Sequence, residues 1–431
     1  MKVRQANRVA GEVRVPGDKS ISHRAAMMSA IANGSTRITN YASSVDCANT
    51  LECLRRLGVT IEKTGSDVSV NGVGKNGLIQ PTADLDCGNS GTTMRLISGI
   101  LAGQPFESTL TGDESLQRRP MKRIIEPLIR MGAEIESIDG RAPLTIRGRK
   151  LQTIEYEPPV ASAQIKSCVL LAGIFADGRT TVVEKIPTRD HTERMLRHFG
   201  VEVDIATSND GTQISVDGTS ELKARDIDVP GDISSAAFLL VAAACLPGSN
   251  LRLLNVGVNQ TRSAIVHVLK SFGVNITIEN LREAGGEPVA DLQVSGGLAA
   301  QQADNVIRGK VIANLIDEIP ILAILGTQLD NGLEVRDAAE LRVKESDRIA
   351  AVAENLRRMN AEIEEFPDGL RISRSQLKAA TIDSFGDHRI AMAFGVAGLL
   401  ADGDTEIIDA ECADVSFPGF FDILSHVADQ G

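Results

Sequence analysis

The chain has 431 residues, of which 42% are hydrophobic and 24% are charged, and its formal net charge is −12. These values are typical of a folded protein with more than one domain, and they exclude a disordered, collagen-like or coiled-coil chain. An acidic chain with no Trp and few other aromatic residues lacks the basic surface and the stacking platforms of nucleic-acid-binding proteins. The longest apolar run, 236–246, is shorter than the ~20 residues of a membrane span, and the six cysteines form no C-x-x-C pair. We therefore expect a cytoplasmic protein with reduced thiols that binds neither nucleic acid nor membrane.

Two sequence patterns alternate along the chain. The first is a polar cap, an apolar helix and a small-residue turn that leads into a strand, and its copies begin at residues 17, 88, 162, 231, 316 and 386. The second is an amphipathic helix followed by a short strand pair, with a sixth, truncated copy at the C-terminus. Its helices end at Gly58, Gly132, Gly200, Gly273 and Asn360, residue types that tolerate the left-handed backbone common after helices.

This recurrence predicts six helix–strand–helix–hairpin units, gathered as three plus three in an α/β fold. The segment RDIDVPGDISS near residue 230 resembles EVRVPGDKS near the N-terminus. We therefore expect one discontinuous domain from 1–17 and 230–431 and a second domain from 18–229.

Several expected helices of the first kind begin with cations, although a helix N-terminus already carries partial positive charge. Lys19 and Arg24, Arg95, Lys166 and Arg389 lie near four of these starts. Each cation there costs ~0.3–1 kcal/mol, a cost that a bound anion would reverse. The fifth start is acidic and carries Asp317. An anion cradle beside a carboxylate that can accept a proton is typical of a catalytic site.

Two further basic segments extend this pattern. Lys344 and Arg348 are four residues apart, which predicts one helix face that also has Glu345 beside it. Arg119 lies in the basic segment 118–123 ahead of another expected helix, and Arg suits bidentate recognition of phosphate or carboxylate. Singly, each cation could belong to a solvated face and Asp317 could be only an N-cap. The recurrence of the pattern favours a ligand site.

The motifs of several common enzyme classes are absent from the sequence. There is no P-loop, no G-x-G-x-x-G that opens a strand–helix turn as a dinucleotide fingerprint does, no H-E-x-x-H or Cys/His cluster, and no G-x-S-x-G elbow. The residues alone therefore predict an enzyme or binding protein for small polyanions that uses neither a cofactor nor a metal.

Five long motifs, in order, resemble the 5-enolpyruvylshikimate-3-phosphate synthase family. They are PGDKSISHR (16–24), GNSGTTMR (88–95), RPMKR (119–123), RVKESDR (342–348) and GDHR (386–389). The resemblance runs from Val15 to Phe421. It implies the inside-out α/β barrel fold of enolpyruvyl transferases, with two domains of three repeated βαβαββ-type units and an active site in the cleft between them. It also implies transfer of the enolpyruvyl group of phosphoenolpyruvate to the 5-hydroxyl of shikimate 3-phosphate, with release of phosphate, in the shikimate pathway.

The resemblance also assigns residues. Shikimate 3-phosphate would be held by Lys19, Ser20, Arg24, Ser162, Ala163, Gln164, Asp317 and Lys344. Phosphoenolpyruvate would be held by Lys19, Asn89, Gly91, Thr92, Arg119, Gln164, Arg348 and Arg389. We expect Asp317 to take the hydroxyl proton and Glu345, with Lys19 nearby, to protonate the methylene carbon. We also expect a monomer that glyphosate inhibits.

Four patterns resemble the glyphosate-tolerant second branch of the family: GDK (17–19), SAQIK (162–166), RDHTE (189–193) and NQTR (259–262). Gly91, however, keeps the small residue associated with room for the inhibitor, so tolerance could be partial. Val415 and Ser416 stand where the other branch has a Lys before its F-P pair.

Two alternatives remain open at this point. A sister enzyme, UDP-N-acetylglucosamine enolpyruvyl transferase, has a reactive loop Cys with no obvious match here. A non-catalytic phosphometabolite-binding protein would explain the cations, but not Asp317 and Glu345 together.

Overall fold

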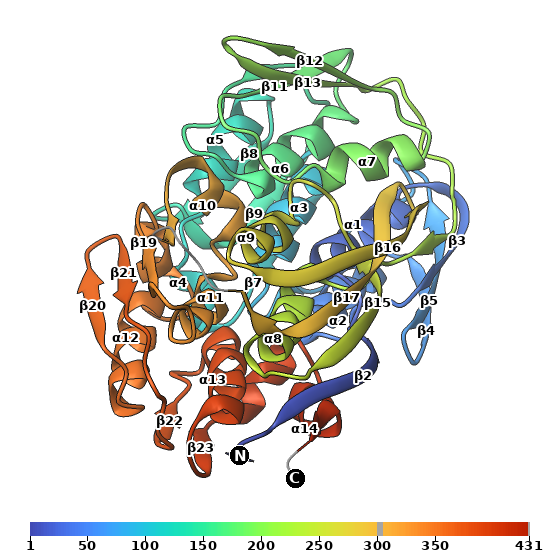
Figure 1. Ribbon diagram of the computed structural model, residues 1–431. Coiled ribbons are helices and arrows are strands. Elements are labelled where there is room, and N and C mark those ends of the chain that lie inside the picture. The colour runs from blue at the N-terminus through green and yellow to red at the C-terminus, as the bar shows by residue number, and fades with distance from the viewer. Residues whose placement is uncertain (300–304, 430–431) are drawn as a thin grey trace. The chain divides into compact units, whose positions relative to one another are not determined.

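The computed structural model describes residues 1–299 and 305–429, which form two compact α/β units (Figure 1). The first unit comprises Met1–Pro16, Pro230–Arg282 and Pro288–Gly431, and the second comprises Gly17–Val229 and Glu283–Glu287. Each unit has its own hydrophobic core.

In the second unit, the described residues form three four-stranded sheets with one shared topology. In each sheet a two-residue edge strand runs parallel to its neighbour, and the other two strands continue antiparallel as a hairpin. The first sheet is ordered β14 (Ile227–Asp228), β3 (Asn33–Thr39), β5 (Asp67–Val73) and β4 (Thr60–Thr64). The second is β6 (Leu85–Asp86), β7 (Glu107–Thr111), β9 (Arg141–Arg147) and β8 (Glu134–Ile138). The third is β10 (Glu155–Tyr156), β11 (Arg179–Glu184), β13 (Gly211–Asp217) and β12 (Val203–Ser208).

In the first unit, the described residues again form three sheets, one of them with the same topology. That sheet is β18 (Val306–Ile307), β19 (Leu333–Val335), β21 (Gly369–Ile372) and β20 (Ile363–Phe366). A five-stranded sheet is ordered β16 (Val274–Ala284), β17 (Glu287–Leu298), β15 (Asn250–Gly257), β2 (Arg8–Arg14) and β24 (Ala428–Asp429). The third contains β1 (Lys2–Val3), β23 (Thr405–Ile408) and β22 (Thr381–Asp383). Here β1 from the N-terminus pairs antiparallel with β23, in the place of the hairpin that the truncated last copy lacks.

The helices follow the two sequence patterns. Helices of the first kind are α1 (Lys19–Ala30), α3 (Gly91–Ala102), α6 (Ala163–Gly173), α8 (Ile233–Cys245), α11 (Ile319–Gly326) and α13 (His388–Leu400). Those of the second kind are α2 (Val45–Arg56), α5 (Lys122–Arg130), α7 (His191–His198), α9 (Ala264–Ser271), α12 (Arg348–Arg358) and α14 (Phe420–Val427). The remaining helical segments are α4 (Glu114–Arg118), α10 (Ile312–Leu315), η1 (Gly309–Val311), η2 (Ala339–Val343) and η3 (Ala410–Val415).

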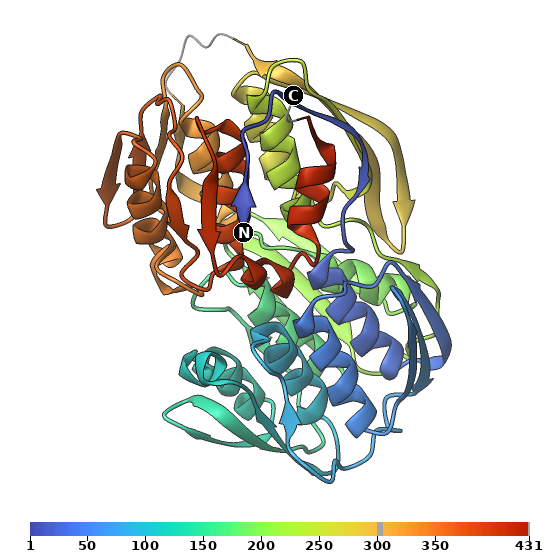
Figure 2. The same ribbon diagram turned by 90° about the horizontal axis from the view of Figure 1, so that it is seen from below.

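The first-kind helices form the centre of each core. Every residue of α8 from Ile233 to Ala244 is buried, and α1 is buried from Ile21 to Ala30. Figure 2 shows the blue to cyan helices α1, α2 and α3 side by side, and all three pack against one another. Removal of apolar surface from water drives this arrangement, at about 25 cal/mol per Å² buried. The first turns of these helices, and the cations in those turns, are therefore held close together.

The expected turn residues after the second-kind helices have the predicted conformation. Gly58, Gly132, Gly200, Gly273 and Asn360 all have positive φ, between 64° and 105°. The left-handed backbone turns the chain from each helix into the next hairpin. This prediction from sequence is confirmed.

Within residues 1–299 and 305–429, no helix is both long and apolar enough to cross a membrane. In the same residues, no three His, Cys, Asp or Glu side chains gather in a way that could hold a metal ion.

Candidate active site

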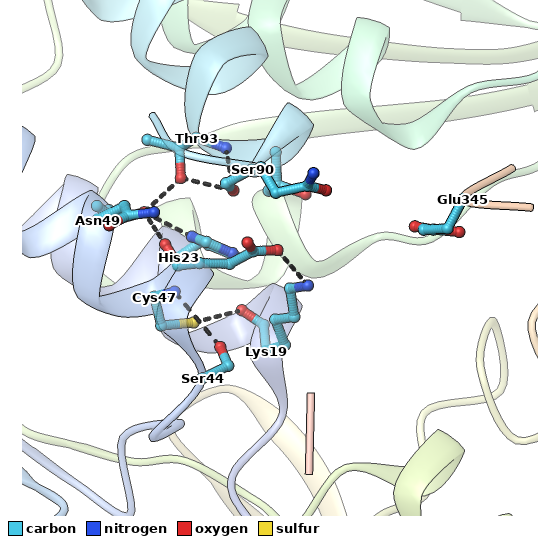
Figure 3. Close-up of polar contacts among 12 residues, drawn as sticks. Lys19, His23, Ser44, Cys47, Asn49, Ser90, Thr93 and Glu345 are labelled. Carbon is cyan, nitrogen blue, oxygen red and sulfur yellow. Dashed lines mark hydrogen bonds and ion pairs between the residues drawn. The ribbon is translucent and has the colours of Figure 1, made fainter. Parts of the chain in front are cut away.

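The start of α1 presents Lys19 beside a carboxylate (Figure 3). Asp18 caps the helix by accepting a hydrogen bond of 2.9 Å from the backbone of Ile21. Gly17 precedes it because any Cβ at that position would lie 1.9 Å from the carbonyl oxygen of Asn40. Lys19 forms an ion pair with Asp46 of α2, and about a quarter of the Lys19 side chain, 27%, stays exposed. The ammonium is therefore positioned by the protein and still accessible to a ligand.

Arg24, one turn further along α1, is buried, and its guanidinium donates hydrogen bonds to three uncharged groups. Nε donates to Thr192 over 2.7 Å, Nη2 to Ser167 over 2.8 Å, and Nη1 to the carbonyl of Ser20 over 2.9 Å. Burial lowers the pKa of Arg24 to about 10, although Glu193 opposes that shift. A buried guanidinium held by hydroxyl groups is well suited to an anionic ligand.

The start of α3 carries a second group of site residues. Ser90 caps the helix, and Asn89 before it accepts a hydrogen bond of 2.8 Å from Arg119 Nη2. Asn89 also donates to Asp113 over 2.7 Å. Arg119, which follows α4, is thus fixed against the turn that contains Gly91.

Gln164 connects the starts of α6 and α3. Ser162 caps α6, and Ala163 is its first residue. The Gln164 amide donates to Thr92 over 3.0 Å and accepts a hydrogen bond from Arg95. The starts of α1, α3 and α6 are therefore linked within the second unit, since Arg24 also reaches Ser167 of α6.

Lys166 does not fit the expectation of a bound anion. Its ammonium lies 2.9 Å from Glu184 and 2.7 Å from Glu193, and only 1% of its side chain is exposed. Burial alone would lower the pKa of Lys166, but the two carboxylates raise it above its ordinary value. Its counter-charge comes from the chain itself, so the interpretation of Lys166 as part of an anion cradle is wrong.

In the first unit, Arg348 is the centre of a cluster of carboxylates. Its Nε donates to Asp387 over 2.8 Å, its Nη2 donates to Glu345 over 2.7 Å, and its Nη1 lies 3.5 Å from Asp317. Burial would lower the pKa of Arg348, yet the charges of Asp387 and Glu345 raise it above the ordinary value. Arg348 is permanently charged at this site.

Asp317 is held from two sides within the same cluster. Arg389 Nη1 donates to its carbonyl over 3.0 Å, and Arg389 Nε lies 3.9 Å from its carboxylate. The residue lies in a turn between α10 and α11, and Glu318 occupies the N-cap position of α11. We expected Asp317 to lie at the start of a helix. That expectation is wrong by two residues, because α11 begins at Ile319.

Glu345 lies against a buried cation. Burial would raise its pKa, but the charge of Arg348, whose Nη2 donates to it, brings the pKa below its ordinary value. His388 itself is neutral, since burial and the neighbouring Arg389 lower its pKa to about 3.

Lys344 and Arg348 do not share a helix face. Lys344 follows η2, whereas Arg348 is the first residue of α12, because Asp347 caps a new helix between them. Lys344 lies 3.4 Å from Glu340 and remains partly exposed.

Sequence reasoning missed four residues that hold the site residues in place: Asp46, Ser167, Thr192 and Asp387. Asp387 stands inside the GDHR motif and Thr192 inside RDHTE, so their positions in motifs were a usable signal. Asp46 and Ser167 carry no comparable signal, because only the fold brings them near their partners.

Comparison with known proteins gives one consistent answer. The model of the family EPSP synthase (3-phosphoshikimate 1-carboxyvinyltransferase) matches residues 3–424. A 3-phosphoshikimate 1-carboxyvinyltransferase of Pelotomaculum thermopropionicum is 54% identical, over 97% of this chain and 96% of the relative. One from Solibacter usitatus is 50% identical, over 99% of both chains. A solved structure of EPSP synthase from Acinetobacter baumannii matches with a TM-score of 0.89 and 42% identity, over 99% of this chain and 98% of the other. This chain belongs to the EPSP synthase family.

Proposed function

We propose that this chain transfers the enolpyruvyl group of phosphoenolpyruvate to the 5-hydroxyl of shikimate 3-phosphate and releases phosphate. The observation that carries the proposal is the cluster around Arg348, where Asp317 is fixed beside two guanidinium groups. Both substrates are small polyanions, and a carboxylate among cations is suited to removing a hydroxyl proton from one of them.

We assign the residues of the two units as follows. The second unit supplies Lys19, Ser20, Arg24, Ser162, Ala163 and Gln164 to shikimate 3-phosphate, and Lys19, Asn89, Gly91, Thr92, Arg119 and Gln164 to phosphoenolpyruvate. The first unit supplies Asp317 and Lys344 to the acceptor and Arg348 and Arg389 to the donor. We propose that the two units are the two domains of the enzyme, with three repeats each, and that both act on one pair of substrates.

The reaction then runs in two steps. In the first, Asp317 takes the 5-hydroxyl proton, the oxygen bonds to C2 of phosphoenolpyruvate, and Glu345 gives a proton to C3. In the second, the bond from C2 to the phosphate oxygen breaks, and phosphate leaves with the electron pair and takes up the proton that Asp317 removed from the hydroxyl. Glu345 takes a proton back from C3, and the carbon–carbon double bond forms again. The cations stabilise the carboxylate and the leaving phosphate.

The lowered pKa of Glu345 adds a requirement to this mechanism. A carboxylate must gain a proton before it can donate one, and the charge of Arg348 opposes that. Anionic phosphoenolpyruvate bound at Arg348 would offset this positive influence and raise the pKa of Glu345. Substrate binding therefore prepares the proton donor.

The test is phosphate release from phosphoenolpyruvate, measured with shikimate 3-phosphate, with UDP-N-acetylglucosamine, and without an acceptor. The proposal expects release only with shikimate 3-phosphate. Release with the nucleotide sugar would favour the sister enzyme, and binding without release would favour a non-catalytic binding protein. Asp317→Ala should abolish turnover while sparing substrate binding, and full activity of that variant would remove Asp317 from its role.

We further propose membership of the glyphosate-tolerant branch, on the four patterns GDK, SAQIK, RDHTE and NQTR. Gly91 limits the tolerance, because a residue without a side chain leaves room for the inhibitor beside two arginines. A methyl group at this position would lie only 3.0 Å from Arg95 Nη1 and 3.6 Å from Arg119 Nη1. Strong inhibition by glyphosate at low micromolar concentration would reject this assignment.

A cytoplasmic monomer is the final part of the proposal. All six cysteines are free, as is usual in a reducing compartment. Sedimentation of the purified chain near its mass of 45.9 kDa would support the monomer, and a mass twice that would refute it.

A further inference from the structure

A chain of buried side-chain hydrogen bonds joins the three helices α1, α2 and α3 (Figure 3). His23 Nδ1 of α1 lies 2.6 Å from Thr50 Oγ1 of α2. Thr50 Oγ1 lies 2.7 Å from Thr93 Oγ1 of α3, and the Thr93 hydroxyl donates to Ser90 Oγ over 2.7 Å. At most 1% of any of these four residues is exposed, so water cannot replace a missing partner.

The donors and acceptors along this chain fit in one direction when the Thr50 hydroxyl donates to Thr93 at 2.7 Å rather than to the Asp46 carbonyl, which lies at 3.4 Å. Because the Thr93 hydroxyl donates to Ser90, its oxygen is left to accept from Thr50. The Thr50 oxygen then accepts from His23 Nδ1, since its own proton is used. Burial, followed by the charges of Lys19 and Arg24, lowers the pKa of His23 well below its ordinary value. A neutral ring has a single N–H, and the chain assigns it to Nδ1.

The two ends of the chain lie at the two substrate-binding turns of the second unit. His23 follows Lys19 and Ser20 by one turn of α1. Ser90 is the N-cap of α3, between Asn89 and Gly91, and it also accepts the backbone hydrogen bond of Thr93 over 3.0 Å. Hydrophobic contacts between helices allow small sliding, whereas a set of directional buried hydrogen bonds specifies one spacing.

We propose that Thr50 and Thr93 are positioning residues for the transfer reaction: they hold the α3 turn, which binds phosphoenolpyruvate, at a fixed spacing from the α1 turn, which binds shikimate 3-phosphate. Neither hydroxyl touches substrate in this role. The inference rests on the proposed function, because it concerns the alignment of those two substrates.

The expected effect falls on turnover rather than on the binding of either substrate alone. Each turn keeps its own residues when the chain is broken, so binary dissociation constants should change less than about twofold. Misplacement of two reacting groups by a fraction of an ångström lowers the rate, and we expect kcat to fall roughly tenfold to a hundredfold.

The experiment compares Thr93→Val and Thr50→Val with Thr93→Ser and Thr50→Ser. Valine keeps the shape and removes the hydroxyl, and serine keeps the hydroxyl. The matched control is Thr36→Val, because Thr36 of β3 is equally buried and its hydroxyl has no hydrogen-bond partner among the described residues. The measurements are kcat, the binary dissociation constant of each substrate by calorimetry, and the thermal midpoint.

The proposal predicts low kcat with unchanged binary binding for both valine variants, and near-wild-type kcat for both serine variants and for Thr36→Val. The double variant Thr50→Val/Thr93→Val should lose no more than either single variant, because one broken link disables the whole chain. Valine variants that lose thermal stability but keep wild-type kcat would overturn the proposal while leaving the proposed function intact. A wild-type chain that releases no phosphate would contradict the function itself, and the proposal with it. If one valine variant fails to fold, the other decides the question.

Discussion

Arg348 Nε and Asp387 Oδ2 lie 2.8 Å apart in the interior of the first unit, with 1% and 0% of their side chains exposed. Removing one partner of such a pair leaves the other buried and charged, at a cost of about 3–5 kcal/mol. We expect Asp387→Asn to lower the free energy of unfolding by about 3 kcal/mol, measured by urea denaturation.

The matched control for that variant is Asp177→Asn. Asp177 forms an ion pair with Lys150 at 2.9 Å, a separation close to the 2.8 Å between Arg348 and Asp387. Both side chains of the control pair, however, are largely exposed. Exposed pairs contribute less than about 1 kcal/mol, so the control should lose little. Equal losses in the two variants would contradict the structural role of Asp387.

The stability of the chain should depend on pH through His388. Its pKa in the folded chain is about 3, below the ordinary 6.5, so the unfolded chain binds more protons between those values. Stability is therefore full above about pH 6.5 and falls as the pH decreases toward 3. His388→Gln should flatten this dependence in denaturation experiments at pH 7.5 and 5.5. His23, whose pKa is also lowered, keeps part of the slope, so a variant with an unchanged slope would contradict the assignment.

Lys166 should act on stability rather than on substrate binding. Replacement by Met leaves Glu184 and Glu193 buried without their cation, and we expect a loss of about 3 kcal/mol or more in the free energy of unfolding. The Michaelis constants of the folded variant should stay near their wild-type values. A large rise in either constant at unchanged stability would restore the anion-cradle interpretation.

Thr192 should control the affinity for shikimate 3-phosphate through Arg24. Thr192→Val removes the acceptor of the Arg24 Nε–H, and hydrogen bonds to charged groups contribute about 1.5–3 kcal/mol. We expect the Michaelis constant for shikimate 3-phosphate to rise about tenfold, and Thr192→Ser to restore it. Unchanged affinity in the valine variant would show that Ser167 and Ser20 suffice to hold the guanidinium.

The repeats could be predicted from sequence because each one carries its own signals. A cap such as Asp18, an apolar helix and a Gly or Asn with positive φ are local features, and they recur in register. The pairing of β1 with β23 could not be predicted, because strands of two residues leave no periodic pattern.

Where the expected site residues lie along the helices was predictable from sequence, and their surroundings were less so. The excess of cations at helix starts indicated an anion site. Lys19 and Arg389 do lie at such starts, and Arg24 lies one turn further along α1. Whether a cation already has a partner depends on residues far along the chain, such as Glu184 for Lys166. Hydroxyl partners such as Thr50 and Thr192 are harder still, because Thr has no charge to stand out in a sequence.

The central claim is that cations of both units serve one reaction, and Lys19→Met and Arg389→Met test it most directly. Lys19 belongs to the second unit and Arg389 to the first, and the exposed Lys150→Met is the control. The account predicts that each of the two variants lowers kcat/KM for phosphoenolpyruvate by roughly a hundredfold or more while the control does not. A folded variant of either residue that keeps kcat/KM within about twofold of wild type would contradict it.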